Sequence, residues 1–414
     1  MSAVWTAYRL VAPALGAAAP AARLFAPAAE RALWAERLWR GAAGPVDAWI
    51  HAASLGEALA VGPLVRALTE LSPRARVHLT ANTTTGRARL GELGHPYSLA
   101  PLDAPQTVGR FLRTLRPRRL FLLETELWPH WLLQARASAV PVAVISARIT
   151  ARSLKRYARL GAAFRSLIAG LDGVLGQSDA DAERWRALGA RPERTAVVGN
   201  LKEDALAGPA PDRAEARRTL GLDPKRPLLV LGSLRPGEAW LLGRAWTSLP
   251  EALRARWQVV AVPRHARAAL ALRAEAAAAG VRSADASGGA DGAWRWDERM
   301  GVLAGYYAAA DVAVVGGSLA PFGGHNPLEP AACGAPVLVG PHHATQGDAV
   351  AALVAAGGAR VVADAAALTD ALARWLGDEG ERTRAGAAAR ATVRARGGAS
   401  RRAVERLGAW GLWP

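Results

Sequence analysis

The stretch AWIHAASLGEALAVG, residues 48–62, joins an apolar strand to a helix through a short polar turn. The turn holds Ser54, Gly56 and Glu57, and an alanine- and leucine-rich segment of helical length follows it. Glycine lets the backbone approach a ligand closely, and the free N–H groups at the start of a helix favour an anion. This unit predicts a parallel α/β fold with polar side chains at the strand ends.

The same alternation of strand and helix continues along most of the chain. In the first half, strands are predicted at residues 48–52, 76–81, 119–124, 140–146, 172–178 and 195–200. In the second half they are predicted at residues 227–233, 257–263, 312–317, 336–340 and 359–363. Buried β-branched runs separated by helix-length segments are typical of parallel sheets covered by helices. Two such series predict two Rossmann-like, doubly wound parallel-sheet domains that face each other across a cleft.

A chain of 414 residues exceeds one typical domain, and residues 206–227, rich in Pro, Gly and charge, are its natural boundary. We predict a helical segment over residues 1–40 and a first Rossmann-like domain over residues 41–205. A second Rossmann-like domain is predicted over residues 206–395, and a C-terminal helix within residues 396–414 should pack back on the first domain.

Composition describes a strongly basic globular protein. The net charge is +17, and only three of the 52 basic residues are lysine. Arginine suits phosphate and carboxylate groups, although high-GC coding would give the same ratio without any function. Nucleic acid, anionic lipid and an anionic metabolite are all partners that this charge allows. The single cysteine, Cys333, excludes an internal disulfide and a cysteine-rich zinc site.

Two basic runs lie in the first half. Residues 110–119 hold five arginines, and residues 148–165 hold six basic residues and no acid. A solvated helix face is the usual explanation of such runs. Runs of a single sign fit an anionic acceptor or a membrane face better.

The N-terminal forty residues lack the basic region and compact apolar core of a secretory signal. The residues that argue against a membrane span are Arg9, Arg23, Pro13, Pro20 and Pro27, because charges interrupt it and prolines would break a helix. Aromatic residues lie between the arginines: Trp5, Tyr8, Phe25, Trp34 and Trp39. The segment is either a bilayer-interface element or a helical pair packed on the protein's own surface, and both remain open.

In the first half, the polar residues after the strands are candidates for catalysis. Glu57 is either a carboxylate that accepts a proton or a first-turn residue favoured by the helix dipole. Glu124 and Glu126 follow a buried strand and would point to the same side if extended, so they are either used or satisfied by Arg or backbone amides. Lys202 follows the last strand and can stabilise a phosphate or carboxylate.

In the second half, the strand ends predict a phosphate-binding site. Arg264 and His265 follow one strand and are suited to a phosphate. The loop VVGGSLAPFGGHNPLEP, residues 314–330, would let backbone amides crowd against an anion, and His325 and Asn326 add donors. Glu329 could accept from a pair of ribose hydroxyls. The loop is neither a Walker A loop nor a GxGxxG fingerprint, so hydride chemistry has no support.

Taken together, HAASLGEALA, LLETELWPHWL, GNLKED, VPRH and VGGSLAPFGGHNPLEPAACGAPVLVGPH resemble the 3-deoxy-D-manno-octulosonic acid (Kdo) transferases of Gram-negative bacteria. The resemblance runs in order from about residue 49 to residue 343. It implies a GT-B glycosyltransferase, with an acceptor domain first and a CMP-sugar domain second, that moves Kdo from CMP-Kdo to lipid A precursor (lipid IVA) in lipopolysaccharide synthesis. It also implies an inverting reaction without a metal or other cofactor, at the cytoplasmic face of the inner membrane, by a protein that is peripheral or N-terminally anchored. The expected partners are CMP-Kdo, lipid A precursor and the anionic membrane surface, with no nucleic acid.

The resemblance assigns roles residue by residue. It makes Glu57 the general base and gives Glu124 and Lys202 the support of the transition state. Together with the strand-end reading, it gives donor-binding candidates that comprise Pro263, Arg264, His265, Met300, Gly301, Val302, Gly317, Ser318, Gly323, Gly324, His325, Asn326, Pro327, Leu328 and Glu329. The acceptor-side candidates are Ser54, Gly56, Glu126 and Arg148. The sugar comes from the resemblance alone, since the residues by themselves indicate only an anion site, an acidic base and a basic face.

The chain departs from the family pattern at four places, one of which is a short region before Met300. The family usually has Gly-Glu-Leu where this chain has Val302 in the middle position, and Asn where it has Ser146. Thr345 and Gln346 replace a usual Asn-Phe pair. Two other classes of protein remain as alternatives. One is another GT-B nucleotide-sugar transferase or epimerase, and the other, more remote, is a non-catalytic basic protein that binds membrane or nucleic acid.

Overall fold

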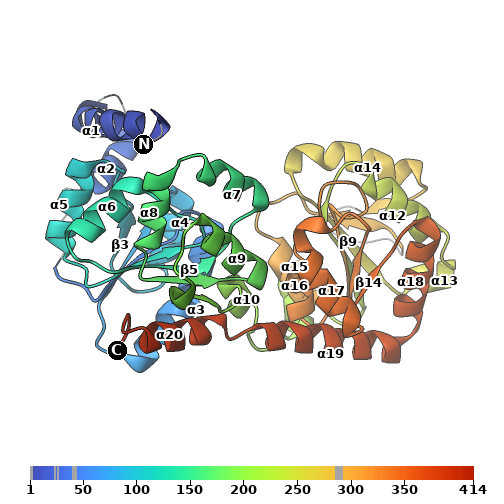
Figure 1. Ribbon diagram of the computed structural model, residues 1–414. Coiled ribbons are helices and arrows are strands. Elements are labelled where there is room, and N and C mark those ends of the chain that lie inside the picture. The colour runs from blue at the N-terminus through green and yellow to red at the C-terminus, as the bar shows by residue number, and fades with distance from the viewer. Residues whose placement is uncertain (1–2, 23–24, 26–27, 40–43, 285–291) are drawn as a thin grey trace. The chain divides into compact units, whose positions relative to one another are not determined.

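The computed structural model describes residues 3–22, 25, 28–39, 44–284 and 292–414. It divides the chain into two compact units, one of residues 1–205 with 397–414 and the other of residues 206–396. Each unit is a parallel sheet of seven strands with helices on its faces, as Figure 1 shows for each of them. The predicted α/β class is confirmed, and the predicted cleft between the domains stays a prediction.

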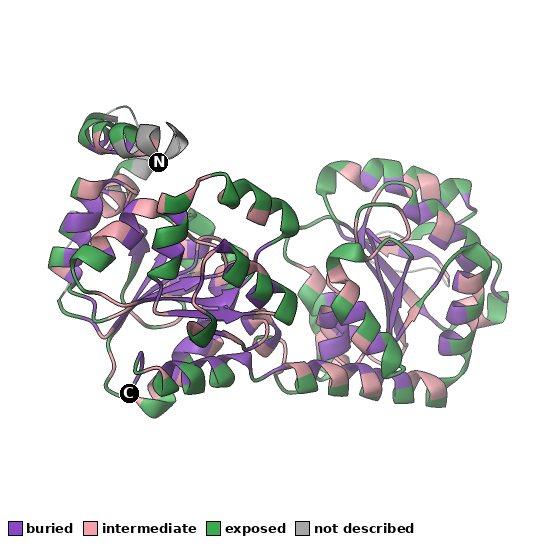
Figure 2. Ribbon diagram, viewed as in Figure 1, coloured by how far each residue is buried: buried purple, intermediate pink, exposed green. Residues whose placement is uncertain are grey.

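The first sheet has the strand order β3-β2-β1-β4-β5-β6-β7. In that order its strands are Tyr97–Leu99, Val77–Ala81, Ala48–His51, Leu120–Leu123, Val142–Ala147, Gly173–Gly176 and Thr195–Val197. The helices of this unit are α1 Ala3–Ala22, α2 Ala28–Arg37, α3 Leu55–Leu71, α4 Thr84–Gly91, α5 Pro105–Leu115, α6 Pro129–Ala137, α7 Ala151–Ala158, α8 Ala162–Ala169, α9 Asp179–Leu188, α10 Leu201–Asp204 and α20 Ala399–Ala409. The central strands are buried along their whole length, which is why they are apolar on both faces (Figure 2).

The second sheet has the order β10-β11-β9-β8-β12-β13-β14. In that order its strands are Ser283–Ala284, Trp294–Trp296, Gln258–Pro263, Leu228–Leu234, Val312–Val315, Val337–Val339 and Ala359–Val361. The helices of this unit are α11 Arg213–Thr219, α12 Glu238–Thr247, α13 Glu251–Ala255, α14 Ala269–Ala278, α15 Leu303–Ala309, α16 Leu328–Ala332, α17 Gly347–Ala355, α18 Ala365–Gly377 and α19 Glu379–Arg396. Both sheets therefore have a doubly wound order, which reverses once, next to β1 in the first and next to β8 in the second.

The N-terminal segment forms two helices, and one expectation about it was wrong. Pro13 and Pro20 lie inside α1 and do not break it, since a proline removes one rung of a helix while the surrounding alanines still favour it. Pro27 and the predicted boundary at residues 40–41 lie outside the described residues. Within the described part of the chain, no helix is both long and apolar enough to cross a membrane.

Two of the N-terminal aromatic residues pack against the first unit. The Tyr8 hydroxyl donates to Asp103, and its ring stacks on His130 with centroids 5.5 Å apart. Trp39 is buried and its ring lies 4.4 Å from that of Phe111, so a bilayer-interface position for Trp39 was wrong. Phe25 is 90% exposed. The helical pair thus packs, at least in part, on the protein's own surface.

Candidate functional site

The strand order of the first unit reverses between β1 and β4, where the crevice of a doubly wound sheet binds ligands. Glu57 lies in the first turn of α3, which follows β1, and Glu124 comes directly after β4. Lys202 lies in α10, and its Nζ is 2.5 Å from Glu124 Oε1. A Cβ added to Gly56 would lie 3.9 Å from that Nζ, so the start of α3 adjoins Lys202. The structure therefore brings the three predicted catalytic residues to one strand edge.

Glu57 is held by a capping box at the start of α3. Its Oε2 accepts the Ala53 N–H at 2.8 Å, and its Oε1 accepts the Ser54 hydroxyl at 3.1 Å. Ser54 in turn caps the helix by accepting the Glu57 N–H. Burial, with the charges of Glu124 and Glu126, raises the pKa of Glu57 to about 7, although the two hydrogen bonds oppose this. Each oxygen keeps a second lone pair, so the group can accept a proton near neutral pH.

The backbone at Glu124 and Glu126 is not extended, so the condition for both side chains to point to one side is not met. Glu124 has a left-handed backbone, with φ +57°, so the chain turns there instead of continuing as a strand. Glu124 consequently pairs with Lys202, while Glu126 accepts the Trp128 indole N–H at 2.7 Å and the Asn82 amide at 3.3 Å. Such conformations are concentrated at functional sites because the surrounding structure must enforce them.

Three residues around Glu126 were missed by the sequence analysis: His51, Asn82 and Trp128. His51 is fully buried at the end of β1, and its Nε2 lies 3.6 Å from Glu126 Oε2. Burial lowers the pKa of His51, so its ring is neutral near pH 7. The sequence does contain a sign of this site. His51 occupies the last position of an otherwise apolar strand, and a buried polar group at such a position needs a hydrogen-bond partner.

The loop after β5 supplies two more of the residues considered above. Ser146 has φ +54°, a conformation that Asn tolerates better than Ser, which explains why Asn would suit this position. Its hydroxyl accepts from the Gln177 amide at 3.1 Å and from the Leu201 N–H at 3.3 Å. The Arg148 side chain is exposed beside this edge.

The basic side chains of the two runs differ in the partners that they have within the protein. In residues 110–119, Arg110 donates to the Leu38 carbonyl, Arg118 lies 3.5 Å from Asp47, and Arg119 stacks on an aromatic ring. Three of the five arginines in that run thus have partners within the protein, and its interpretation as an acceptor or membrane face stays a prediction. In residues 148–165, by contrast, no basic side chain forms an ion pair with any described residue, and α7 has no buried residue at all.

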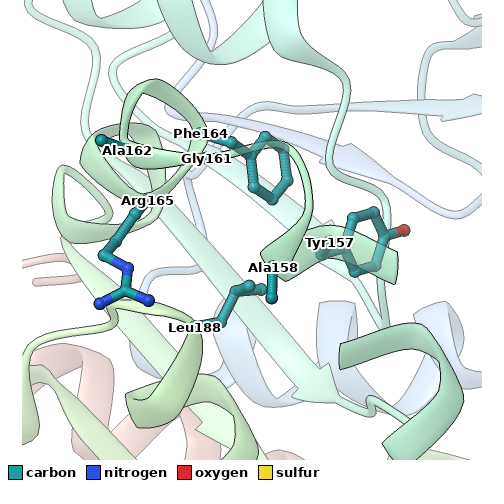
Figure 3. Close-up of a pocket in the computed structure, with 7 residues that line it drawn as sticks. All are labelled: Tyr157, Ala158, Gly161, Ala162, Phe164, Arg165 and Leu188. Atoms are coloured by element: carbon teal, nitrogen blue, oxygen red, sulfur yellow. The ribbon is translucent and has the colours of Figure 1, made fainter. Parts of the chain in front are cut away.

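A cavity of about 320 Å³ opens beside α7, between α7, α8 and the end of α9 (Figure 3). Tyr157 and Phe164 form part of its lining with Leu188, and Arg165 is the cation among the lining residues. None of the predicted catalytic residues lines it. The cavity is therefore an apolar feature next to a basic helix and holds none of the predicted acid–base groups.

In the second unit the strand order reverses between β8 and β12, and the glycine-rich loop follows β12. A buried carboxylate that the sequence analysis missed, Glu238 in the motif GSLRPGE, organises this loop. Its Oε2 accepts the N–H groups of Arg235 at 2.8 Å and Gly317 at 2.9 Å. Its Oε1 accepts those of Leu319 at 2.9 Å and Ala320 at 3.2 Å. The loop that was predicted to bind an anion is thus tied by its own backbone to an internal carboxylate.

Two glycines of the loop are required by close approach. A Cβ on Gly316 would lie 2.6 Å from the Ser233 carbonyl oxygen, and one on Gly317, where φ is +72°, would lie 2.8 Å from the His325 ring. Thr345, a departure from the family pattern, donates its hydroxyl to the Gly323 carbonyl at 2.5 Å. The Thr345 hydroxyl also lies 3.0 Å from the Gly324 carbonyl oxygen, so this side chain holds the double-glycine turn.

Several arginine and histidine side chains lie beside this glycine-rich loop. Arg264 is exposed just after β9, as is His265. The Arg235 guanidinium lies over the Phe322 ring, 4.2 Å from its centroid. Burial, with the neighbouring Arg264 and Arg235, lowers the pKa of His325 to about 4, so His325 is a neutral donor near pH 7. Exposed guanidinium groups can bind a phosphate.

The remaining donor-side candidates divide into exposed and structural residues. The Asn326 amide donates to Glu329 Oε1 at 3.3 Å, and burial raises the pKa of Glu329. The Ser318 hydroxyl is 1% exposed and bridges β12 and β13, because it donates to the Val315 carbonyl and accepts the Gly340 N–H. Met300 is 75% exposed. The other candidates are placed as follows: Gly301 is exposed, Pro263 and Leu328 are buried, and Val302 packs under α15.

Comparison with known proteins identifies the family. Residues 29–205 match the profile of the family "3-Deoxy-D-manno-octulosonic-acid transferase (kdotransferase)". A 3-deoxy-D-manno-octulosonic acid transferase of Bordetella pertussis is 38% identical over 383 residues, which cover 89% of this chain and 88% of the relative. This chain belongs to the Kdo transferase family. It is thereby an enzyme of the glycosyltransferase class.

Two further similarities concern the sequence and the fold, respectively. A Kdo transferase of Haemophilus influenzae is 32% identical over 311 residues, covering 72% of this chain and 71% of the relative. The UDP-GlcNAc 2-epimerase of Neisseria meningitidis, bound to UDP-GlcNAc, superposes with a TM-score of 0.62 at 13% identity, covering 87% of this chain and 99% of that one. The latter shows a shared fold alone, and with the two doubly wound sheets it confirms the predicted GT-B class.

Proposed function

We propose that this Kdo transferase moves Kdo from CMP-Kdo to a hydroxyl of a lipid A precursor, lipid IVA, with inversion and without a metal ion. The observation that carries the proposal is the Glu57 carboxylate, whose pKa is raised to about 7 at the strand edge that also holds Glu124 and Lys202. The family supplies the sugar, and 38% identity across most of the chain favours it over another nucleotide-sugar transferase or epimerase.

The first unit would supply the acid–base chemistry. The acceptor hydroxyl oxygen forms a bond to the anomeric carbon of Kdo while the bond from that carbon to the phosphate oxygen breaks. CMP leaves with the bonding electrons, and the hydroxyl proton passes to Glu57. Attack on the face opposite to the leaving group inverts the anomeric centre. Lys202, held by Glu124 at 2.5 Å, stabilises the negative charge that develops during transfer.

The second unit would hold the leaving nucleotide. The exposed Arg264 can pair with the phosphate, so we propose that it takes the place of a metal ion in this role. Asn326 and Glu329, joined by a hydrogen bond of 3.3 Å, are placed to receive the ribose hydroxyls. Ser318 and Leu328 support the loop from inside instead of contacting the nucleotide.

The acceptor would bring an anionic, acylated lipid to the first unit. The unpaired basic residues of α7 and the exposed Arg148 suit its phosphate groups and the surface of the inner membrane. We therefore place the enzyme at the cytoplasmic face of that membrane, held by α7 and by the N-terminal segment. No nucleic acid is needed to account for the charge.

The deciding assay combines the detergent-solubilised protein with CMP-Kdo and tetra-acylated lipid A precursor. CMP release and the mass of the lipid are followed, and the mass gives the number of Kdo residues added. Glu57→Gln should remove most of the turnover while CMP-Kdo still binds, and EDTA should leave turnover unchanged. Glu70→Gln, at the exposed end of the same helix, is the matched control and should retain activity. An unmodified lipid after incubation with folded protein that binds CMP would refute the acceptor assignment.

A further inference from the structure

Glu126 bonds to the protein through one carboxylate oxygen and leaves the other open. Its Oε2 accepts the Trp128 indole N–H at 2.7 Å and the Asn82 amide at 3.3 Å. The buried His51 ring also faces this oxygen, with its Nε2 at 3.6 Å. No described residue bonds to Oε1, and the Glu126 side chain is 20% exposed, so a ligand can reach it. A carboxylate oxygen has two lone pairs, and Oε1 can therefore accept a hydroxyl group.

The same hydrogen bond fixes an exposed aromatic ring. Trp128 comes directly before α6 and is 37% exposed. Its indole N–H is held by Glu126, and its ring lies 6.0 Å from that of the buried Trp131. An indole that is bonded through its N–H and packed against another ring keeps one orientation, so its exposed surface is formed in advance. A flat apolar surface beside an open carboxylate oxygen suits a sugar ring, which has C–H groups on its faces and hydroxyls at its edge.

Asn82 adds hydrogen-bonding groups and connects this surface to the predicted base. Because a carboxylate only accepts, Asn82 presents its NH₂ group to Glu126, which leaves its Oδ1 and a second N–H for a ligand. The Asn82 backbone N–H donates to the Ala53 carbonyl at 3.0 Å, and the Ala53 N–H donates to Glu57 Oε2 at 2.8 Å. One residue, Ala53, is thus bonded both to this surface and to the carboxylate that is proposed to take the proton of the acceptor.

We propose that Trp128, Glu126 and Asn82 bind a sugar ring of the acceptor. The ring stacks on the Trp128 indole, and its hydroxyls bond to Glu126 Oε1 and to the Asn82 amide. This inference rests on the proposed function, because it takes the sugar to be that of the lipid A precursor. Kdo fits this surface poorly, since it carries a carboxylate that the charge of Glu126 would repel. Within the part of the chain that the structure describes, Glu126 pairs with no lysine or arginine that would offset this charge.

The first test is the steady-state kinetics of Trp128→Ala with both substrates. Loss of the stacking surface should raise KM for the lipid acceptor about tenfold or more, while kcat and KM for CMP-Kdo stay within about twofold. Trp128→Phe keeps an aromatic face and should stay within about threefold of the wild type in all three constants. The matched control is Trp240→Ala, since Trp240 is 46% exposed on α12 of the other unit and should leave every constant unchanged. An unchanged acceptor KM in Trp128→Ala, or a rise in the KM for CMP-Kdo alone, overturns the proposal.

The second test measures binding without turnover. With ¹⁵N-labelled tryptophan, the Trp128 indole N–H resonance is assigned by its loss in Trp128→Phe. The probe is an N-acetylated glucosamine disaccharide, which is neutral and soluble in water. Its titration should shift the Trp128 resonance until it saturates and leave that of Trp240 in place. Free Kdo, which carries a carboxylate, should move neither resonance.

The two tests separate this proposal from the proposed function. If the disaccharide shifts the Trp128 resonance but no Kdo reaches the lipid, the sugar-binding surface stands and the transfer reaction is wrong. If Kdo transfer is normal in Trp128→Ala and the disaccharide leaves the Trp128 resonance in place, the transfer reaction stands and the sugar-binding surface is refuted. A shift caused by free Kdo and not by the disaccharide also refutes it, because the surface would then belong to the donor sugar.

Discussion

Replacing Glu238 by Gln tests how the glycine-rich loop of the second unit is held. Both carboxylate oxygens accept two backbone N–H groups each, which leaves a carboxylic-acid proton no acceptor, so the ionised form fits the site. A glutamine keeps one carbonyl oxygen, and two of the four N–H groups would then face an amide N–H₂. Two lost charge-assisted hydrogen bonds are worth about 3 kcal/mol or more in this fully buried position.

The effect should be local, so hydrogen exchange is the suitable assay. About 3 kcal/mol corresponds to a loss of amide protection of roughly 100-fold in peptides covering residues 312–324. Glu275→Gln is the matched control, because Glu275 accepts a single N–H, that of Gly237 at 2.8 Å, and glutamine can keep that contact. In Glu275→Gln, the amide protection of the same peptides should stay within about threefold of the wild type. Equal protection in Glu238→Gln and the wild type would show that the carboxylate does not hold the loop.

Three other substitutions have defined outcomes. Lys202→Met removes the cation of the strand-edge pair and should lower kcat by about two orders of magnitude, measured as CMP release, with CMP-Kdo binding retained. Gly317→Ala places a methyl group 2.8 Å from an imidazole at φ +72° and should weaken CMP binding at least tenfold by calorimetry, whereas Gly347→Ala, with nothing within 4 Å, should not. Arginine and tyrosine partners lower the pKa of Asp297 to about 2, so its stabilisation is present above pH 4 and lost as pH falls towards 2. Asp297→Asn should thus cost about 2 kcal/mol in urea unfolding at pH 7 and little near pH 2, and a constant difference would contradict the assignment.

Much of the fold could be predicted from the sequence because buried parallel strands have a simple pattern. All eleven predicted strands are present, since each is an apolar run between helix-length segments. The three missed strands, β3, β10 and β11, contain two or three residues each, which is too short for periodicity to register. They lie at or next to the edges of the two sheets, where less burial is required.

The residue types of the site were also predictable, because polar groups directly after buried strands converge at one edge. The ion-pair and hydrogen-bond partners of these residues could not be predicted from the sequence. Nothing in ETELWP shows that Glu124 adopts φ +57°, which decides that Lys202 pairs with it and not with Glu126. Similarly, Glu238 looks like an ordinary first-turn residue of a helix until its four N–H donors are known, because three of them lie in the loop after β12, far along the chain.

The helix α20 has a consequence for how the protein is made. The second unit is inserted into the first, because residues 397–414 return to the unit formed by residues 1–205. There, Leu407 and Trp413 complete the core beneath α3, and the Trp413 indole donates to the Leu68 carbonyl. During synthesis, the helix that bears Glu57 has an uncovered apolar face until the last part of the chain leaves the ribosome. A chain that ends before residue 397 lacks this cover of α3, so the core of its first unit is incomplete.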